Sequence, residues 1–257
     1  MESKRLVECL DADYARMREV AAGADLTAMV PSCPDWTVAD LVRHVGVVYL
    51  HKVECMRLGS HPEQWPPPGV NEEEPLALLD RTYAALAAEF AARDPESTAF
   101  TWYSPDQTVG FWIRRMAQET VIHRVDADLG AGAPIAPIPA DLALDGIDEF
   151  LVAFVEYGSR AWPDEYGDIL ATADGRAVRV ETPDAAWLVR PTPEAVEVSA
   201  ADTTASSDTT AADAVVRGEP ASLLLWLWNR AGDDTVNISG ATDAVAYLRK
   251  VLAAGAQ

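Results

Sequence analysis

This chain of 257 residues has little positive charge, few cysteines and no long apolar run. Its 20 Lys and Arg residues stand against 41 Asp and Glu residues, and the formal net charge of −21 gives a surface that repels nucleic-acid phosphates and anionic lipids. We therefore expect neither nucleic acid nor a membrane as a partner. The three cysteines, Cys9, Cys33 and Cys55, are too few and too irregularly spaced for a disulfide framework or a CxxC zinc site.

No stretch reaches the roughly 18 apolar residues of a transmembrane helix, and no apolar segment follows the first residues as it does in a secretory signal. Together with the scarcity of cysteine, these absences predict a cytoplasmic protein. The hydrophobic content of 49% rules out a disordered chain, and the length allows two domains that each bury a core.

Four segments of the first half carry apolar residues at spacings of three and four, which is typical of amphipathic helices. They cover residues 3–22, 37–58, 75–92 and 109–130. The second begins with Thr37 as an N-cap and Asp40 three places on, the pattern of a capping box. We expect a four-helix bundle over residues 1–133, an architecture that builds metal sites from inward-facing side chains on different helices.

The second half has a different pattern, separated from the first by a proline-rich segment that predicts a linker. Residues 140–257 are expected to form a smaller α+β domain, so the whole chain is of the α + (α+β) class. The expected helices cover 141–159, 220–230 and 242–252, and the expected strands cover 168–173, 177–182, 186–190, 195–198 and 235–239. Asp174-Gly175 favours a tight hairpin turn between the first two strands, and the Ser/Thr-rich tract 199–213 predicts a mobile loop.

Glu119 and His123 lie four residues apart in the fourth segment, so on a helix they share one face. His44 lies on the apolar stripe of the second segment. If that helix faces the fourth segment, His44 is the third ligand. Trp112 and Met116 place the Glu119 pair on the inward side of its helix, where a buried carboxylate needs a compensating positive charge. The sequence predicts a metal site made of His44, Glu119 and His123.

Two alternatives stay open for these residues. His44 taken alone is more typical of a packed, hydrogen-bonded core histidine than of a metal ligand, and Glu119 with His123 is also found as a solvated pair on a helix surface. As metal ligands, two imidazoles and one carboxylate match catalytic zinc and also the facial triad of non-haem iron, so another divalent metal remains open.

Three further residues carry weaker signals. Asp126 lies three residues after His123, and we interpret it as a surface acid because Arg124 and Asp128 indicate a charged, solvated helix end. His51 is a spare candidate ligand on the stripe of His44, and His61 is expected in a loop.

Three stretches, in this order along the chain, carry a family resemblance. They are CPDWTVADLVRH at 33–44, QETVIHRVD at 118–126 and GEPASLLLWLWNR at 218–230. Together they resemble the mycothiol-dependent maleylpyruvate isomerase family. The resemblance implies a DinB-like metal-binding bundle, with His44, Glu119 and His123 as zinc ligands and mycothiol as a thiol cosubstrate. It also implies a functional arginine in the C-terminal domain, for which Arg230 is the best match and Arg217 the next.

The implied function is an enzyme that activates a low-molecular-weight thiol for addition to a small electrophilic substrate. Zinc with one anionic ligand keeps positive charge and binds a thiol as thiolate, and Arg230 suits a substrate carboxylate. The outcome is cis–trans isomerisation, or thiol transfer if the adduct is kept. A metal-dependent hydrolase and a non-catalytic metal-containing binding or regulatory protein are the alternatives, and we expect a monomer or a homodimer.

Overall fold

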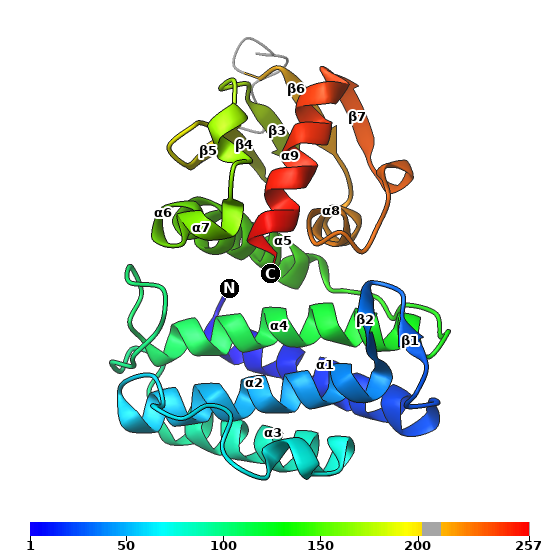
Figure 1. The fold of residues 1–257 in the computed structure, drawn as a ribbon, viewed down its shortest axis with the longest axis vertical. Coiled ribbons are helices and arrows are strands. Elements are labelled where there is room, and N and C mark those ends of the chain that lie inside the picture. The colour runs from blue at the N-terminus through cyan, green and yellow to red at the C-terminus, as the bar shows by residue number, and fades with distance from the viewer. Residues whose placement is uncertain (202–211, 257) are drawn as a thin grey trace. The chain divides into compact units, whose positions relative to one another are not determined.

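The computed structural model describes residues 1–201 and 212–256 (Figure 1). The chain divides into two compact units, Met1–Pro137 and Ile138–Gln257. Within the described residues, no helix has the length and apolar character needed to cross a membrane.

The N-terminal unit is a bundle of four helices that lie side by side (Figure 1). The helices are α1 (Ser3–Gly23), α2 (Val38–Leu58), α3 (Pro75–Ala92) and α4 (Val109–Gly130). Helix α1 packs mainly on α4, and α2 packs on both α3 and α4. Apolar side chains such as Leu10, Leu41 and Leu79 fill the space between them and are almost fully buried. The predicted helical N-terminal domain is confirmed.

The start and the end of α2 are fixed by local interactions that set the positions of its histidines. Thr37 accepts a hydrogen bond from the Asp40 backbone N–H at 3.2 Å, and the Asp40 carboxylate accepts one from the Thr37 backbone N–H at 2.9 Å. This is the predicted capping box. At the other end Gly59 adopts φ +70°, which favours glycine, and its N–H donates to the Cys55 carbonyl at 2.9 Å.

A short antiparallel hairpin precedes α2. Its strands are β1 (Met29–Val30) and β2 (Cys33–Thr37), and both lie against α2. The hairpin matters for the site because it carries Ser32, Cys33 and Trp36 to the neighbourhood of α4.

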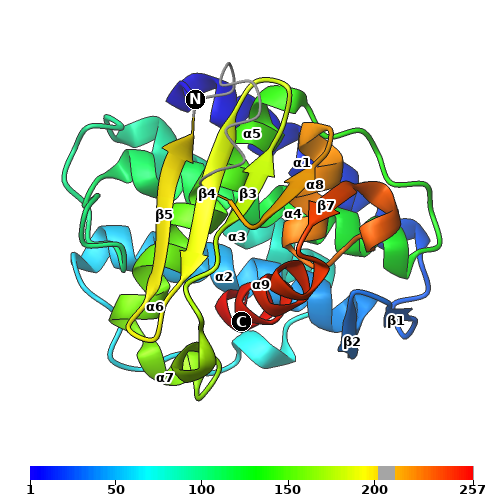
Figure 2. The same ribbon diagram turned by 90° about the horizontal axis from the view of Figure 1, so that it is seen from above.

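The C-terminal unit combines a five-stranded sheet with helices (Figures 1 and 2). The sheet order is β5-β4-β3-β6-β7, in which only the β3–β6 pair is parallel. The strands are β3 (Val178–Glu181), β4 (Ala186–Pro191), β5 (Val196–Ala201), β6 (Ala214–Arg217) and β7 (Asn237–Gly240). The helices are α5 (Ala140–Glu149), α6 (Gly158–Ala161), α7 (Pro163–Tyr166), α8 (Pro220–Leu227) and α9 (Thr242–Gly255), and a π-helical segment (Phe150–Tyr157) joins α5 to α6. The predicted combination of helices and strands in this half is confirmed.

Two details of the second half differ from the prediction. Residues 168–173 form a turn with a short 3-10 helix at Leu170–Thr172, so they are not a strand, and β3 pairs with β4 and β6 instead. The Asp174 side chain accepts hydrogen bonds from Arg176, which also pairs with Asp243 of α9. Strand β6 was not predicted. In the Ser/Thr-rich tract, 199–201 complete β5, and the loop prediction for 202–211 lies outside the described residues.

Candidate metal centre

The three residues predicted as metal ligands converge on one point between α2 and α4. His44 Nε2 lies 3.3 Å from Glu119 Oε1, and His123 Nε2 lies 3.3 Å from the same oxygen. The three ligand atoms are all within 4.8 Å of one another. Glu119 and His123 share a face of α4 because they are one turn apart, and the packing of α2 on α4 supplies His44.

The site is partly covered. The side chains of His44, Glu119 and His123 keep 35%, 16% and 11% of their exposure, so His44 forms the open side. Trp36 of the hairpin packs against the His44 ring with a centroid distance of 4.6 Å. An aromatic wall on one side and solvent on the other leave room for a small ligand next to His44.

Asp126 is a buried partner of His123, contrary to our interpretation of it as a surface acid. Its side chain is fully buried, and its Oδ2 atom lies 2.9 Å from His123 Nδ1. Ser32 Oγ donates to Oδ1 at 2.5 Å, and Cys33 Sγ lies 3.7 Å from Oδ2. A carboxylate that accepts the Nδ1–H of an imidazole fixes the ring orientation and leaves the Nε2 lone pair for a metal.

The expected solvated helix end is also absent, because the charges beside Asp126 are paired with residues far away in the sequence. Arg124 is fully buried and pairs with Asp13 of α1 at 2.9 Å and with Asp128 at 3.2 Å. Arg16 of α1 reaches the other oxygen of Asp128 at 3.0 Å. Burial in a network of ion pairs explains why so many charged residues occupy this end of α4.

One cation pairs with Glu119 and a second packs on Trp112 of the same helix, and neither was singled out from the sequence. Arg115, one turn before Glu119, donates from Nη2 to Glu119 Oε2 at 2.9 Å, which leaves Oε1 facing the histidines. Lys52 Nζ lies 5.1 Å from the centroid of the Trp112 ring. Burial lowers the pKa of Lys52 to about 8, although Glu119 acts in the opposite direction. The spacing of four between Arg115 and Glu119 was the signal that could have identified this pair.

The carboxylates of Glu119 and Asp126 favour positive charge at the two histidines. Burial by itself raises the pKa of Glu119. His123 outweighs that effect by charge and hydrogen bonding, His44 and Arg115 add to it, and the pKa lies well below its ordinary value. For His123, burial lowers the pKa, but Glu119 and Asp126 outweigh it and raise the pKa to about 9. Without a metal ion, His123 therefore carries the positive charge that balances Glu119, and a divalent ion between the two histidines would replace it.

These residues fit a divalent metal by their donor chemistry. Two imidazole nitrogens and one carboxylate oxygen converge, the carboxylate is ionised, and His123 has the partner on its other ring nitrogen that metal-bound histidines commonly have. Three protein ligands with an exposed side are typical of catalytic rather than structural zinc sites.

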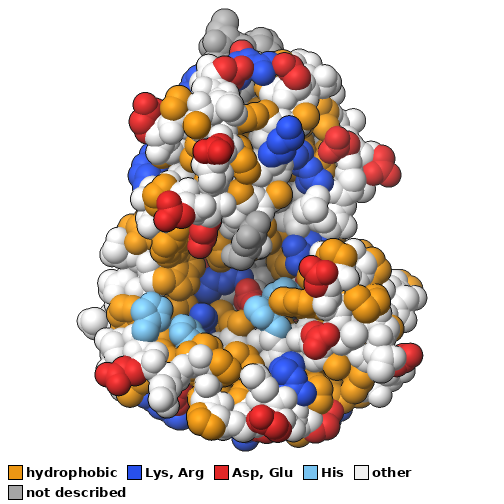
Figure 3. Space-filling view, in the orientation of Figure 1, with side chains coloured by type: hydrophobic (Ala, Val, Ile, Leu, Met, Phe, Trp, Pro, Cys, Tyr) orange, Lys and Arg blue, Asp and Glu red, His pale blue; other side chains and the backbone are white. Residues whose placement is uncertain are grey.

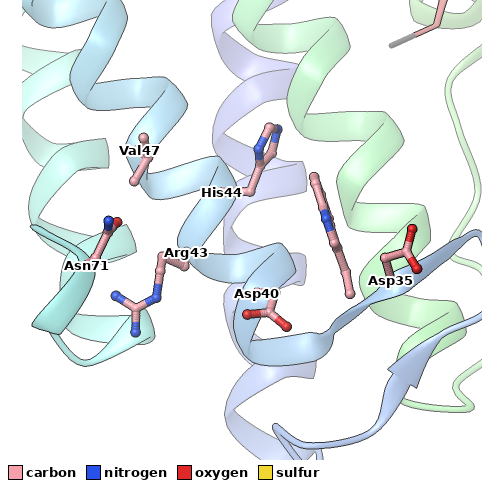
Figure 4. Close-up of a pocket in the computed structure, with 7 residues that line it drawn as sticks. Asp35, Asp40, Arg43, His44, Val47 and Asn71 are labelled. Atoms are coloured by element: carbon pink, nitrogen blue, oxygen red, sulfur yellow. The ribbon is translucent and has the colours of Figure 1, made fainter. Parts of the chain in front are cut away.

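An open depression of about 410 Å³ lies next to the cluster, with His44 on its wall (Figure 4). It is lined by Asp35, Trp36, Asp40, Arg43, His44, Val47 and Asn71. The guanidinium of Arg43 is held by the backbone carbonyls of Val70 and Glu73 at 3.3 and 2.7 Å. The depression thus offers a ligand one aromatic wall, two carboxylates and a fixed cation within the N-terminal unit.

The remaining candidates have other contacts. Arg230 follows α8 in the C-terminal unit, where its Nη1 donates to the Trp228 carbonyl at 2.8 Å. Arg217 is in β6, and its Nε donates to Glu181 at 2.9 Å. His51 is not part of the His44 cluster but lies beside Cys55, and His61 is in a loop as expected.

Two family models match the chain. The one described as the mycothiol maleylpyruvate isomerase N-terminal domain matches residues 7–128, and the MDMPI C-terminal domain matches residues 141–246. The chain belongs to the mycothiol maleylpyruvate isomerase family. In this family member, the first matched region contains all three residues of the candidate metal centre, and the second contains Arg217 and Arg230.

Solved structures show the same fold for this member of the mycothiol maleylpyruvate isomerase family. A crystal structure of the mycothiol-dependent maleylpyruvate isomerase is similar with a TM-score of 0.60 and 16% identity, covering 93% of each chain. A mutant of that protein gives a TM-score of 0.62 and 15% identity, again covering 93% of each chain. None of the curated proteins matches the sequence. At this identity the likeness establishes the fold alone.

Proposed function

We propose that this protein is a mycothiol-dependent zinc enzyme that activates a low-molecular-weight thiol for addition to a small, electrophilic carboxylate. The convergence of His44, Glu119 and His123 on one point is the observation that carries the proposal. Family membership supports the choice of thiol, since the similar solved structures are of a mycothiol-dependent isomerase.

His44, Glu119 and His123 would hold the metal in this proposal. When bound, zinc lowers the pKa of a thiol so that the nucleophilic thiolate forms near neutral pH. Asp126 keeps the Nδ1 proton of His123 and so presents Nε2 to the site. Arg115 neutralises the second oxygen of Glu119, which keeps the site cationic once a divalent ion is added.

Excess positive charge at the site favours anionic ligands. Arg115 pairs with the carboxylate ligand, so with a divalent ion the positive charges outnumber the negative ones there. A thiolate and a substrate carboxylate both gain from this field in a partly buried site. His44, on the exposed side, leaves an approach for the thiol along the Trp36 wall.

Arg230 is proposed to hold a substrate carboxylate by paired hydrogen bonds. With the substrate held, the thiolate sulfur bonds to one carbon of a conjugated cis double bond, and the electron pair moves onto the conjugated carbonyl oxygen. Rotation about the resulting single bond, followed by return of the electron pair and departure of the thiolate, gives the trans isomer. A transferase would instead protonate the adduct and release it.

A turnover screen tests the proposal. The zinc-loaded protein is incubated with unsaturated dicarboxylates and other conjugated electrophiles, with and without mycothiol, and products are identified by mass spectrometry. Thiol-dependent turnover is expected. Turnover without thiol would favour a metal-dependent hydrolase, and no turnover in any arm would favour a metal-containing binding protein.

Variants connect the activity to the site. Glu119→Gln removes the anionic ligand with little change in shape, and we expect the metal of the His44 centre and thiol-dependent turnover to be lost together. Glu54→Gln, on the surface of α2, is the matched control and should keep both. Full activity in Glu119→Gln after metal removal would contradict the proposal.

A further inference from the structure

A second cluster of metal-ligating side chains lies at the C-terminal end of α2. His51, Cys55 and His61 each offer one ligand atom, and these atoms are within 4.8 Å of one another. His51 and Cys55 are one helical turn apart, and Cys55 Sγ lies 3.7 Å from His51 Nδ1 and 3.9 Å from Nε2. None of the three belongs to the His44 cluster.

The end of α2 brings the third side chain into place. Gly59, in the left-handed conformation, stops the helix and turns the chain, so that the loop residue His61 returns over the last turns. The His61 and His51 ring centroids are 5.7 Å apart. Phe100 packs edge-on against His61 at 4.7 Å, and Trp65 packs edge-on against His51 at 4.7 Å. Aromatic neighbours therefore hold both imidazoles beside the thiol.

We propose that His51, Cys55 and His61 form a second metal site, distinct from the His44 centre, for a thiophilic first-row ion such as Zn²⁺. One sulfur and two imidazole nitrogens are typical ligands of zinc and copper, whereas Mg²⁺ and Ca²⁺ prefer oxygen ligands. His61 is exposed while Cys55 is fully buried, so the ion enters from the solvent side. Figure 3 shows histidine side chains in two separate places on the N-terminal unit. The proposal goes beyond the proposed function, which needs only the His44 centre.

Metal binding at this site removes the proton of the Cys55 thiol and the hydrogen bond between Lys52 and His51. The Cys55 thiol loses its proton to solvent when the sulfur bonds to the ion. Lys52 Nζ lies 3.1 Å from His51 Nδ1, and a neutral imidazole has a single lone pair. Whichever ring nitrogen binds the ion, the Lys52 ammonium can no longer donate to His51. Lys52→Met should therefore tighten binding at this site, and weaker binding in that variant would count against the proposal.

Cobalt titration tests the second site without relying on activity. Co²⁺ bonded to a thiolate gives a charge-transfer absorption in the near ultraviolet, which the thiolate-free His44 centre does not produce. The metal-stripped full chain should bind two Co²⁺ and develop this band. Cys55→Ser should abolish the band, and His61→Ala, at an exposed position, should raise the half-saturating Co²⁺ concentration at least about tenfold. Circular dichroism checks that each variant is folded.

Two controls separate this site from the other cysteines and from the His44 centre. Cys33→Ser should keep the band, and so should Glu119→Gln, which should lose only the other metal equivalent. The proposal is wrong if the wild type shows no band, if the band persists in Cys55→Ser, or if it disappears in Cys33→Ser. Unchanged cobalt affinity in His61→Ala would also refute it. Loss of thiol-dependent turnover with an intact band would affect the proposed function alone.

Discussion

Replacing Asp126 with asparagine should weaken metal binding without unfolding the bundle. Asp126 does not bind the ion in the proposed centre, but its fully buried side chain places Oδ2 2.9 Å from Nδ1 of the ligand His123. The amide keeps the size of the carboxylate and can still accept the Nδ1–H, while its nitrogen faces the Ser32 hydroxyl, which can accept. The change therefore removes charge from the partner of His123 and leaves the shape nearly intact.

The expected loss follows from the strength of that interaction. A hydrogen bond to a charged group contributes about 1.5 to 3 kcal/mol. Loss of such a partner behind a metal-bound histidine typically lowers metal affinity by about 10- to 100-fold, which corresponds to about 1.4 to 2.7 kcal/mol. The two ranges agree, so we expect the zinc dissociation constant of Asp126→Asn to rise by about 10- to 100-fold. Competition with a chromophoric chelator at fixed pH measures this constant.

Asp128→Asn is the matched control, because Asp128 is equally buried on the same helix but pairs with Arg124 and Arg16 instead of a histidine. Breaking a buried ion pair costs about 3 to 5 kcal/mol of folding stability. Asp128→Asn should therefore lower the unfolding midpoint more than Asp126→Asn does, yet keep the zinc affinity. Wild-type affinity in Asp126→Asn, or an equal loss in both variants, would refute the role given to Asp126.

Three further outcomes are expected. Zinc at about 100 times its dissociation constant should stabilise the folded protein by about 2.7 kcal/mol through the His44 centre. A chelator should therefore lower the melting temperature of the wild type in calorimetry by more than that of Glu119→Gln, which lacks this ion. Arg230→Ala should reduce thiol-dependent turnover by about 10- to 150-fold, the equivalent of about 1.5 to 3 kcal/mol. Arg230→Lys should restore little of the turnover, because a bidentate contact with a carboxylate needs the guanidinium. Normal turnover in Arg230→Ala would point to Arg217 as the carboxylate-binding residue. Burial raises the pKa of Glu89, but Arg57 and Arg93 outweigh it by hydrogen bonds of 2.7 and 2.9 Å, and the pKa is lowered. The stabilisation from Glu89 is therefore present above the unfolded-state pKa of about 4.3 and is lost as the pH falls through the folded-state pKa. Urea unfolding should show that Glu89→Gln lowers the free energy of unfolding by about 0.5 to 1 kcal/mol at pH 7 and by less near pH 3. The same loss of stability at both pH values would contradict this prediction.

The helices of the N-terminal unit were predictable because their signals are local. The 3.6-residue period marks the buried stripe of each helix, and the capping box of Thr37 and Asp40 fixes the start of α2. The same period places Glu119 and His123 on one face of α4. In the second half the signals are shorter, and a six-residue stretch such as 168–173, with only four apolar residues, does not distinguish a strand from a turn of helix. Strand β6 was missed because it pairs with β3, more than thirty residues earlier.

The sequence by itself determined the helices of the bundle and the shared face of Glu119 and His123, since both depend on side chains a few residues apart. Only the tertiary structure decided the surroundings of the site. Asp126 resembled a surface acid because its neighbours are charged, but those charges are paired with Asp13 and Arg16 of α1, and Asp126 itself is enclosed by the hairpin. The cluster of His51, Cys55 and His61 likewise required the turn at Gly59 to become visible. Burial and pairing across distant segments set the charge of a carboxylate, and the local spacing of residues does not contain that information.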